Sequence, residues 1–82
     1  MKKINRFSML ILDGTDLSES YYKDITNTDI PYQAIDICKE LVTDLGNLIN
    51  EVWLFDNTIC TTVAKIYKTV DNKAFVKCYA VL

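Results

Sequence analysis

The spacing of apolar residues changes near residue 50 from the period of a helix to the period of a strand. Before that point, apolar residues recur at intervals of three and four, the spacing of one amphipathic helix. These residues are Ala34, Ile37, Cys38, Leu41, Leu45 and Leu48. From Glu51 on, the period is two, which is typical of strands. A chain of this kind buries its apolar surfaces by packing the helix on the sheet.

The start and end of this helix are also marked in the sequence. Asp29 has a side chain that favours the N-cap position, and Pro31 is tolerated in a first helical turn. We expect the helix to run to about Leu45 or Ile49. Gly46 either ends it as a C-cap or weakens its last turn.

Two further elements are expected before the helix. Residues 7–12 are apolar at nearly every position, which predicts a strand inside a sheet. Asp16 and Glu19 have the spacing of a capping box, which predicts a short helix from Leu17 to about Ile25. The alternative for this segment is a long polar loop, which is unusual in so small a domain unless it is functional.

After the helix, the pattern predicts three antiparallel strands joined by tight turns at 56–57 and 71–73. In this register Val70 lies opposite Ala74, Ile66 opposite Cys78, and Ala64 opposite Ala80. One face then carries Ala64, Ile66, Val70, Val76, Cys78, Ala80 and Leu82, and the other carries Val63, Lys65, Tyr67, Thr69, Phe75, Lys77, Tyr79 and Val81.

The predicted fold is therefore a single α+β domain over residues 1–82. It has two layers, a helix on a four-stranded, mostly antiparallel sheet, in the order strand, short helix, helix, strand, strand, strand. The helix covers one face. The other face, with Tyr67, Phe75, Tyr79, Lys65 and Lys77, is uncovered. It is either an ordinary surface with lysine stems lying across the rings, or a face for self-association as a homodimer or for a partner.

Motifs of catalysis and metal binding are incomplete. The stretch LILDGTDL, residues 10–17, resembles the first motif of the haloacid dehalogenase superfamily, where a strand ends in Asp-x-Asp-Gly-Thr and the first Asp is the nucleophile. Ile11 occupies that position here, and its side chain cannot attack phosphorus. The chain also has no histidine, the commonest general base. The sequence predicts a protein that is not an enzyme and has no cofactor and no metal site.

The cysteines and the length of the apolar runs indicate the cellular compartment of the protein. Three cysteines, Cys38, Cys60 and Cys78, form neither an even set nor a C-x-x-C pair, which argues against a disulfide framework and a zinc site. No apolar run approaches the ~20 residues of a membrane span. We expect a cytoplasmic protein. Eight lysines to one arginine, with many Ile, Asn and Tyr, are typical of an AT-rich genome such as that of a low-GC bacterium or its phage.

Positive and negative charges are concentrated in different regions of the chain. Residues 1–10 carry a net +3, residues 11–60 a net −8 and residues 61–82 a net +3, which together give −2. In the middle region, Asp36, Glu40 and Asp44 recur every four residues on the helix face opposite the apolar stripe. Like charges at this spacing destabilise a helix slightly. The preceding segment would widen this acidic surface with Asp13, Asp16, Glu19, Asp24 and Asp29.

Two interpretations of these acids remain open. They form either a solvated helix face or a surface that docks on a basic protein, for example one that binds nucleic acid. The leading hypothesis is a small non-enzymatic binding protein, an inhibitor encoded by a phage or mobile element, that docks through this acidic surface. The alternative is a module that binds single-stranded nucleic acid or a small ligand through the Tyr/Phe/Lys strand face, although the negative net charge disfavours nucleic acid.

Overall fold

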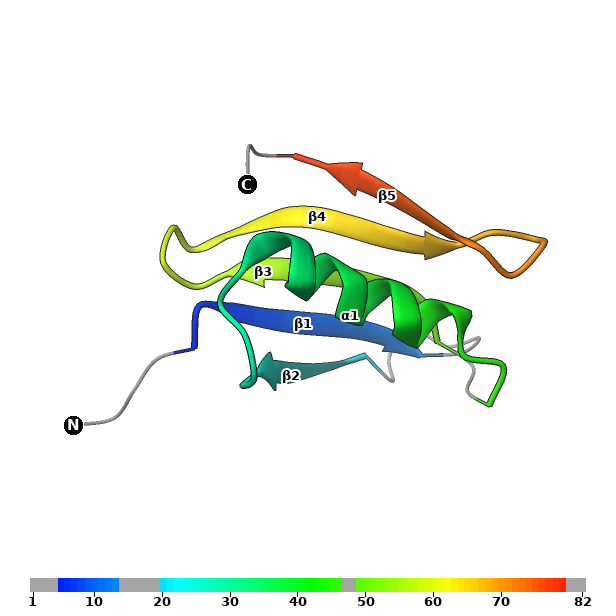
Figure 1. Cartoon of the computed structure of the whole chain (residues 1–82), viewed down its shortest axis with the longest axis horizontal. Helices are drawn as coiled ribbons and strands as arrows, with labels where there is room; N and C mark the ends of the chain where they lie inside the picture. The colour runs from blue at the N-terminus through cyan, green and yellow to red at the C-terminus, as the bar shows by residue number, and fades with distance from the viewer. Residues whose placement is uncertain (1–4, 14–19, 47–48, 80–82) are drawn as a thin grey trace.

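One helix lies on a five-stranded antiparallel sheet (Figure 1). The computed structural model describes residues 5–13, 20–46 and 49–79. Its elements are β1 (Phe7–Asp13), β2 (Tyr21–Ile25), α1 (Pro31–Thr43), β3 (Ile49–Asp56), β4 (Thr61–Lys68) and β5 (Ala74–Cys78). The strand order is β2-β1-β3-β4-β5. The predicted α+β class, with a helix on a sheet, is confirmed.

The prediction of four strands and a short helix was wrong, because residues 21–25 form the strand β2. β2 pairs with β1, with Leu10 opposite Tyr22. Both edges of β1 are therefore hydrogen-bonded, to β2 and to β3, as expected for an internal strand. Strand pairing satisfies the backbone of this segment, and Ile25 enters the core. The residues with capping-box spacing, Asp16 and Glu19, lie outside the described residues.

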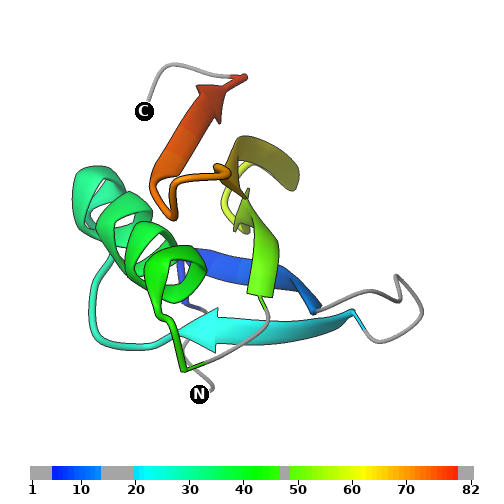
Figure 2. The same cartoon turned by 90° about the vertical axis from the view of Figure 1, so that its right-hand side faces the viewer.

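The core lies between α1 and one face of the sheet (Figure 2). Alternate residues of β1 and β3, together with residues of β4, face α1, which contributes Ala34, Cys38 and Val42. The fully buried large side chains of this core are Phe7, Ile11, Leu54, Ile66, Val42, Val52, Val63 and Cys38. Leu45, predicted to belong to the apolar stripe, is 83% exposed because it follows the end of the helix. Leu48 lies outside the part of the chain that is described.

The ends of α1 differ from the prediction by one to a few residues. Ile30, not Asp29, is the N-cap, and its N–H donates to Thr28 Oγ1 at 3.1 Å. Pro31 then fits the first turn, where no intrahelical N–H is needed. The C-cap residue is Asp44. Its Oδ1 accepts the N–H of Gly46 at 2.8 Å, and the chain turns here instead of continuing as a helix. Among the described residues, no helix is long and apolar enough to cross a membrane.

The connection between β4 and β5 is longer than the predicted turn. It spans residues 69–73, closed by the Thr69 N–H donating to the Lys73 carbonyl at 2.8 Å, with Asn72 at a positive φ of 61°. The register therefore differs by two from the predicted one. The pairs are Lys68–Ala74, Ile66–Val76 and Ala64–Cys78. Because the difference is even, the residues of these pairs keep their predicted faces, but Val70 lies in the loop and is fully exposed.

Two details of β4 also correct the prediction. The turn between β3 and β4 spans residues 57–60 instead of 56–57, with Cys60 at a φ of 53°. The β3–β4 pairing then shifts between Leu54 and Phe55, which leaves Val63 as an extra residue in β4. Val63 is fully buried in the core and does not lie exposed beside Lys65 as predicted. Residues 80–82, assigned to both faces by the prediction, lie outside the described ranges.

The contrast between two leucines tests this core. We expect Leu54→Ala to lower the free energy of unfolding by about 2–5 kcal/mol, because it removes a fully buried side chain from between α1 and the sheet. Leu45→Ala should change it by less than about 0.5 kcal/mol, since Leu45 is exposed. Urea unfolding monitored by circular dichroism measures both. Equal losses of unfolding free energy in the two variants would contradict the end of α1 at Thr43.

Candidate binding surface

The sheet face turned away from α1, here called the open face, carries its side chains in three rows. No described element covers this face (Figure 2). The strand pairing defines the rows. The middle row is Tyr22, Leu10, Trp53, Lys65 and Lys77, one outer row is Asp24, Ser8, Phe55 and Thr62, and the other is Leu12, Glu51, Tyr67 and Phe75. Tyr79 follows β5, and its N–H donates to the Val63 carbonyl at 2.8 Å.

Aromatic side chains on the open face are accessible to solvent. Tyr22 is 70% exposed, Phe75 57% and Tyr79 47%, and Trp53, Phe55 and Tyr67 are half-buried. Single exposed apolar residues are ordinary on protein surfaces, but contiguous apolar patches mark interaction sites. On the open face the rings of Trp53, Phe55, Tyr67 and Phe75 come from the adjacent strands β3, β4 and β5, and Leu10 of β1 lies between them and Tyr22.

The two lysines of the open face lie against its rings. Lys65 Nζ is 3.8 Å from the Trp53 ring centroid and 5.3 Å from that of Tyr79, and Lys77 Nζ is 5.4 Å from Tyr79. Ammonium groups at these distances interact favourably with the rings. Lys65, Lys77 and Tyr79 are therefore grouped on one face, with the lysine ammonium groups near the rings.

A polar network joins the rings at one end of the open face. Trp53 Nε1–H donates to Glu51 Oε1 at 2.7 Å, and the Tyr67 and Phe75 ring centroids are 6.5 Å apart. Burial, the neighbouring Tyr79 hydroxyl and the negative charge of Glu51 raise the pKa of Tyr67 above its ordinary value of 10.0.

Several residues of this surface were missed from the sequence. They are Leu10, Leu12, Tyr22, Glu51, Trp53 and Phe55. The alternation of residues 51–55 carried a signal, because Val52 and Leu54 face the core and their neighbours must face outward. Tyr22 could not be found while its segment was predicted to be a helix.

The predicted acidic residues on α1 are exposed on the opposite side of the molecule. Asp36 and Glu40 project from α1, and no ion pair among the described residues includes either of them. Lys39 and Lys73 border the same shallow groove between α1 and the loop at 69–73, so positive charges are interspersed with the acids. Asp44 is exposed just after the helix.

The acids of the preceding segment are in different surroundings. Asp24 belongs to the open face, where its Oδ1 accepts the Ser8 hydroxyl at 2.8 Å. Asp29 is exposed before α1, and its backbone carbonyl accepts Arg6 Nη1 at 3.2 Å. The side chain of Asp13, and Asp16 and Glu19, lie outside what the structure describes. Docking of a basic partner on the whole acidic set therefore stays a prediction.

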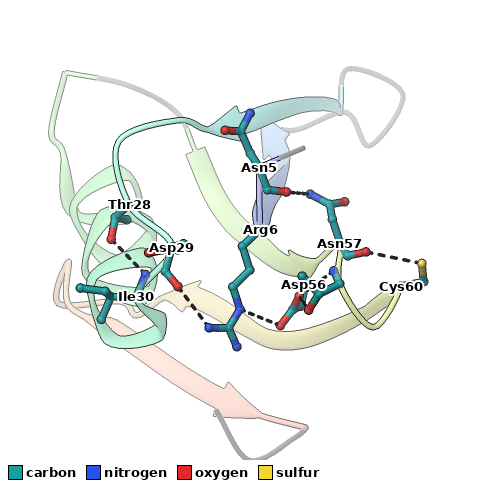
Figure 3. Close-up of polar contacts among 9 residues, drawn as sticks. Asn5, Arg6, Thr28, Asp29, Ile30, Asp56, Asn57 and Cys60 are labelled. Atoms are coloured by element: carbon teal, nitrogen blue, oxygen red, sulfur yellow. Dashed lines mark hydrogen bonds and ion pairs between the residues drawn. The ribbon is translucent and has the colours of Figure 1, made fainter. Parts of the chain in front are cut away.

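A partly buried ion pair between Arg6 and Asp56 closes the end of the sheet where β3 turns into β4 (Figure 3). Asp56 is 1% exposed. Its Oδ2 accepts Arg6 Nε at 3.3 Å, and its Oδ1 accepts the Thr58 N–H at 2.9 Å and hydroxyl at 2.6 Å. Burial alone would raise the pKa of Asp56, but the Thr58 hydrogen bonds and the charge of Arg6 outweigh it and lower the pKa below 3.8. Its carboxylate is fully used in holding the turn.

Burial in the core also raises the pKa of the Cys38 thiol, to about 12. A thiol that does not ionise is a poor nucleophile. Cys38 is therefore a packing residue. Within the described ranges, no group of three Cys, Asp or Glu side chains is placed to hold a metal ion.

The Asp56 ion pair gives a pH-dependent prediction. Because the folded-state pKa is depressed, the ionised carboxylate stabilises the fold above pH 3.8 and loses this effect as pH falls through the folded-state value. Asp56→Asn should lower the free energy of unfolding by about 1–3 kcal/mol at neutral pH, and the difference from wild type should shrink in acid. Urea unfolding over a pH series measures it, with the exposed Asp36→Asn as control. A difference that is constant with pH would contradict this role.

What the open face can do chemically is bind. It is a twisted sheet surface (Figure 2) of rings, aliphatic side chains and a few charges of both signs, with hydroxyl and amine donors at fixed positions. Such a surface suits another macromolecular surface better than a small molecule, which binds in concave sites. No family model, no curated protein and no solved structure matches the chain at a significant level.

Proposed function

We propose that this chain is a non-enzymatic binding module that recognises a protein with the open face of its sheet. The observation that supports the proposal most strongly is the three-row arrangement of rings and aliphatic side chains on the face that α1 leaves uncovered. Tyr, Trp and Phe are enriched in the cores of protein interfaces. Three of the rings, those of Tyr22, Phe75 and Tyr79, are well exposed on this face.

The titratable groups support a role in binding rather than in catalysis. A general acid or base needs a pKa near the working pH and a position in a cleft. The pKa of Asp56 is lowered and the pKa of Cys38 is raised, so both lie further from neutral pH than the ordinary values of these groups. Both side chains are used in holding the fold.

The charges of the open face favour a protein over nucleic acid. Lys65 and Lys77 are balanced on the same face by Glu51 and Asp24. Binding to a phosphate backbone requires clustered, uncompensated positive charge. A face with balanced charges and exposed rings is better suited to a protein surface of mixed character.

Variants of two exposed aromatic residues test this proposal. Phe75 lies on the open face and is 57% exposed, and Tyr32 lies on α1 and is 65% exposed. Immobilised wild type and Tyr32→Asp should retain the same proteins from a lysate of the source cell, and Phe75→Asp should lose them, because a charge disrupts the apolar contact. Circular dichroism checks that both variants fold.

Two outcomes would count against the proposal. Retention of the same proteins by Phe75→Asp would exclude the open face as the surface that binds them. Tight binding of a fluorescent oligothymidylate by the wild type, with quenching of Trp53 emission, would instead support the module for single-stranded nucleic acid.

A second candidate function is docking of the acidic helix side on a basic protein, as expected of a phage or mobile-element inhibitor. It is favoured by the exposure of Asp36 and Glu40 and by the lack of an ion pair to either one among the described residues. Two unpaired carboxylates at this spacing can be neutralised by a partner at little desolvation cost.

This second function predicts a salt-dependent interaction with a basic probe. A short poly-arginine peptide should bind the wild type, with an affinity that falls from low to moderate salt. The triple variant Asp36→Asn, Glu40→Gln, Asp44→Asn should bind it several-fold more weakly, and the exposed loop variant Asp71→Asn should not differ from wild type. Titration calorimetry measures the affinities. An affinity independent of salt, or unchanged in the triple variant, would exclude docking through these residues.

A further inference from the structure

We infer that the protein bound by the open face is a second copy of this chain, packed face to face with β2 of one copy over β5 of its partner. The inference rests on the proposed function, because it names the partner of that surface. Two properties of the open face support it, the positions of its charges and the character of its middle strand, and its area sets the expected strength of association.

The charges have opposite signs at opposite edges of the sheet. Asp24 lies on β2 at one edge, whereas Lys77 lies on β5 at the other and Lys65 lies next to it on β4. A two-fold axis along the central strand β3 exchanges the two edges, so that β2 of each copy lies over β5 of the other. Lys77 then faces Tyr22 and the neighbouring Asp24 of the second copy. An axis across the strands would instead bring Lys77 onto its own counterpart.

The middle of the face suits the centre of such a dimer. Trp53 and Phe55 of β3 lie at the axis, and Leu10 lies beside Trp53 on β1. Large half-buried rings at the centre and charges at the rim are the usual arrangement of an interface. Two charges depart from this arrangement. Lys65 of β4 lies against the Trp53 ring, and Glu51 also lies on β3 and would approach its own counterpart. This repulsion opposes association and provides a specific test.

The size of the face sets the expected affinity. Five strands spaced about 4.8 Å apart give a width of about 24 Å, and three rows about 7 Å apart give a length of about 20 Å with the side chains. The resulting area of about 500 Å² per chain is somewhat below the roughly 600 Å² per partner at the low end of stable interfaces. We therefore expect a reversible dimer that dissociates at micromolar concentrations.

Sedimentation equilibrium of the full chain tests the association. The wild type should be a reversible monomer–dimer system. Tyr22→Ser should raise the dissociation constant about tenfold or more, because the change occurs twice in a two-fold dimer. Tyr32→Ser, with a comparably exposed tyrosine on α1, should leave it unchanged. Glu51→Gln should lower it, since the amide still accepts the Trp53 N–H but removes the repulsion at the axis.

A charge exchange tests the orientation. Asp24→Lys and Lys77→Glu should each weaken the dimer several-fold, and the double variant should recover most of the loss if β2 lies over β5. Additive losses in the double variant would overturn this orientation. The recovery also controls for loss of the hydrogen bond from Ser8 to Asp24.

The inference and the proposed function fail in different ways. A wild type that stays monomeric at several hundred micromolar overturns the second copy as partner. If Phe75→Asp still loses the captured proteins in that case, the open face remains a binding surface for a different protein. Dimerisation that is weakened by Tyr22→Ser and strengthened by Glu51→Gln supports the inference, and dimerisation that neither variant changes overturns it.

Discussion

The single helix is the constraint on which the rest of the structure depends, because it can cover only one face of the sheet. α1 spans thirteen residues, and its buried side chains Ala34, Cys38 and Val42 are small to medium in size. This allows a close approach to the sheet, where Leu54 and Ile66 are fully buried. The chain has no second described helix for the other face, so that face is left to solvent or to a partner.

The two faces of the sheet therefore serve different purposes in the same strands. In β3, Val52 and Leu54 face the core, whereas Trp53 faces outward among exposed or half-buried rings. A change at Trp53 can therefore alter the open face with little effect on the core. The Arg6–Asp56 pair ties the residue just before β1 to the end of β3, and the Thr58 hydrogen bonds of the same carboxylate hold the β3–β4 turn. A binding surface on paired strands is more rigid than one on loops.

The sequence predicted the parts of this structure that local spacing determines. The helix, the strands after it and the outward grouping of Lys65, Phe75 and Lys77 follow from a period of 3.6 or 2, and β1 follows from its continuous apolar run. β2 was missed because Asp16 and Glu19, just before it in the sequence, have the spacing of a helix capping box. Residues 21–25 form a strand because they pair with the edge of β1. The rows of the open face were missed for a related reason, since they depend on which strands pair, and pairing is not a local property.

The five-residue connection from Thr69 to Lys73 bears on how this chain can change its length during evolution. Side chains in β5 alternate between core and solvent, with Val76 packed against the core and Lys77 outside. Insertion or deletion of two residues that slides β5 along β4 preserves both environments. A slide of one residue would bury a lysine and expose a valine at the sheet edge. A change in the length of this loop is therefore tolerated where it only lengthens the loop or slides β5 by an even number of residues.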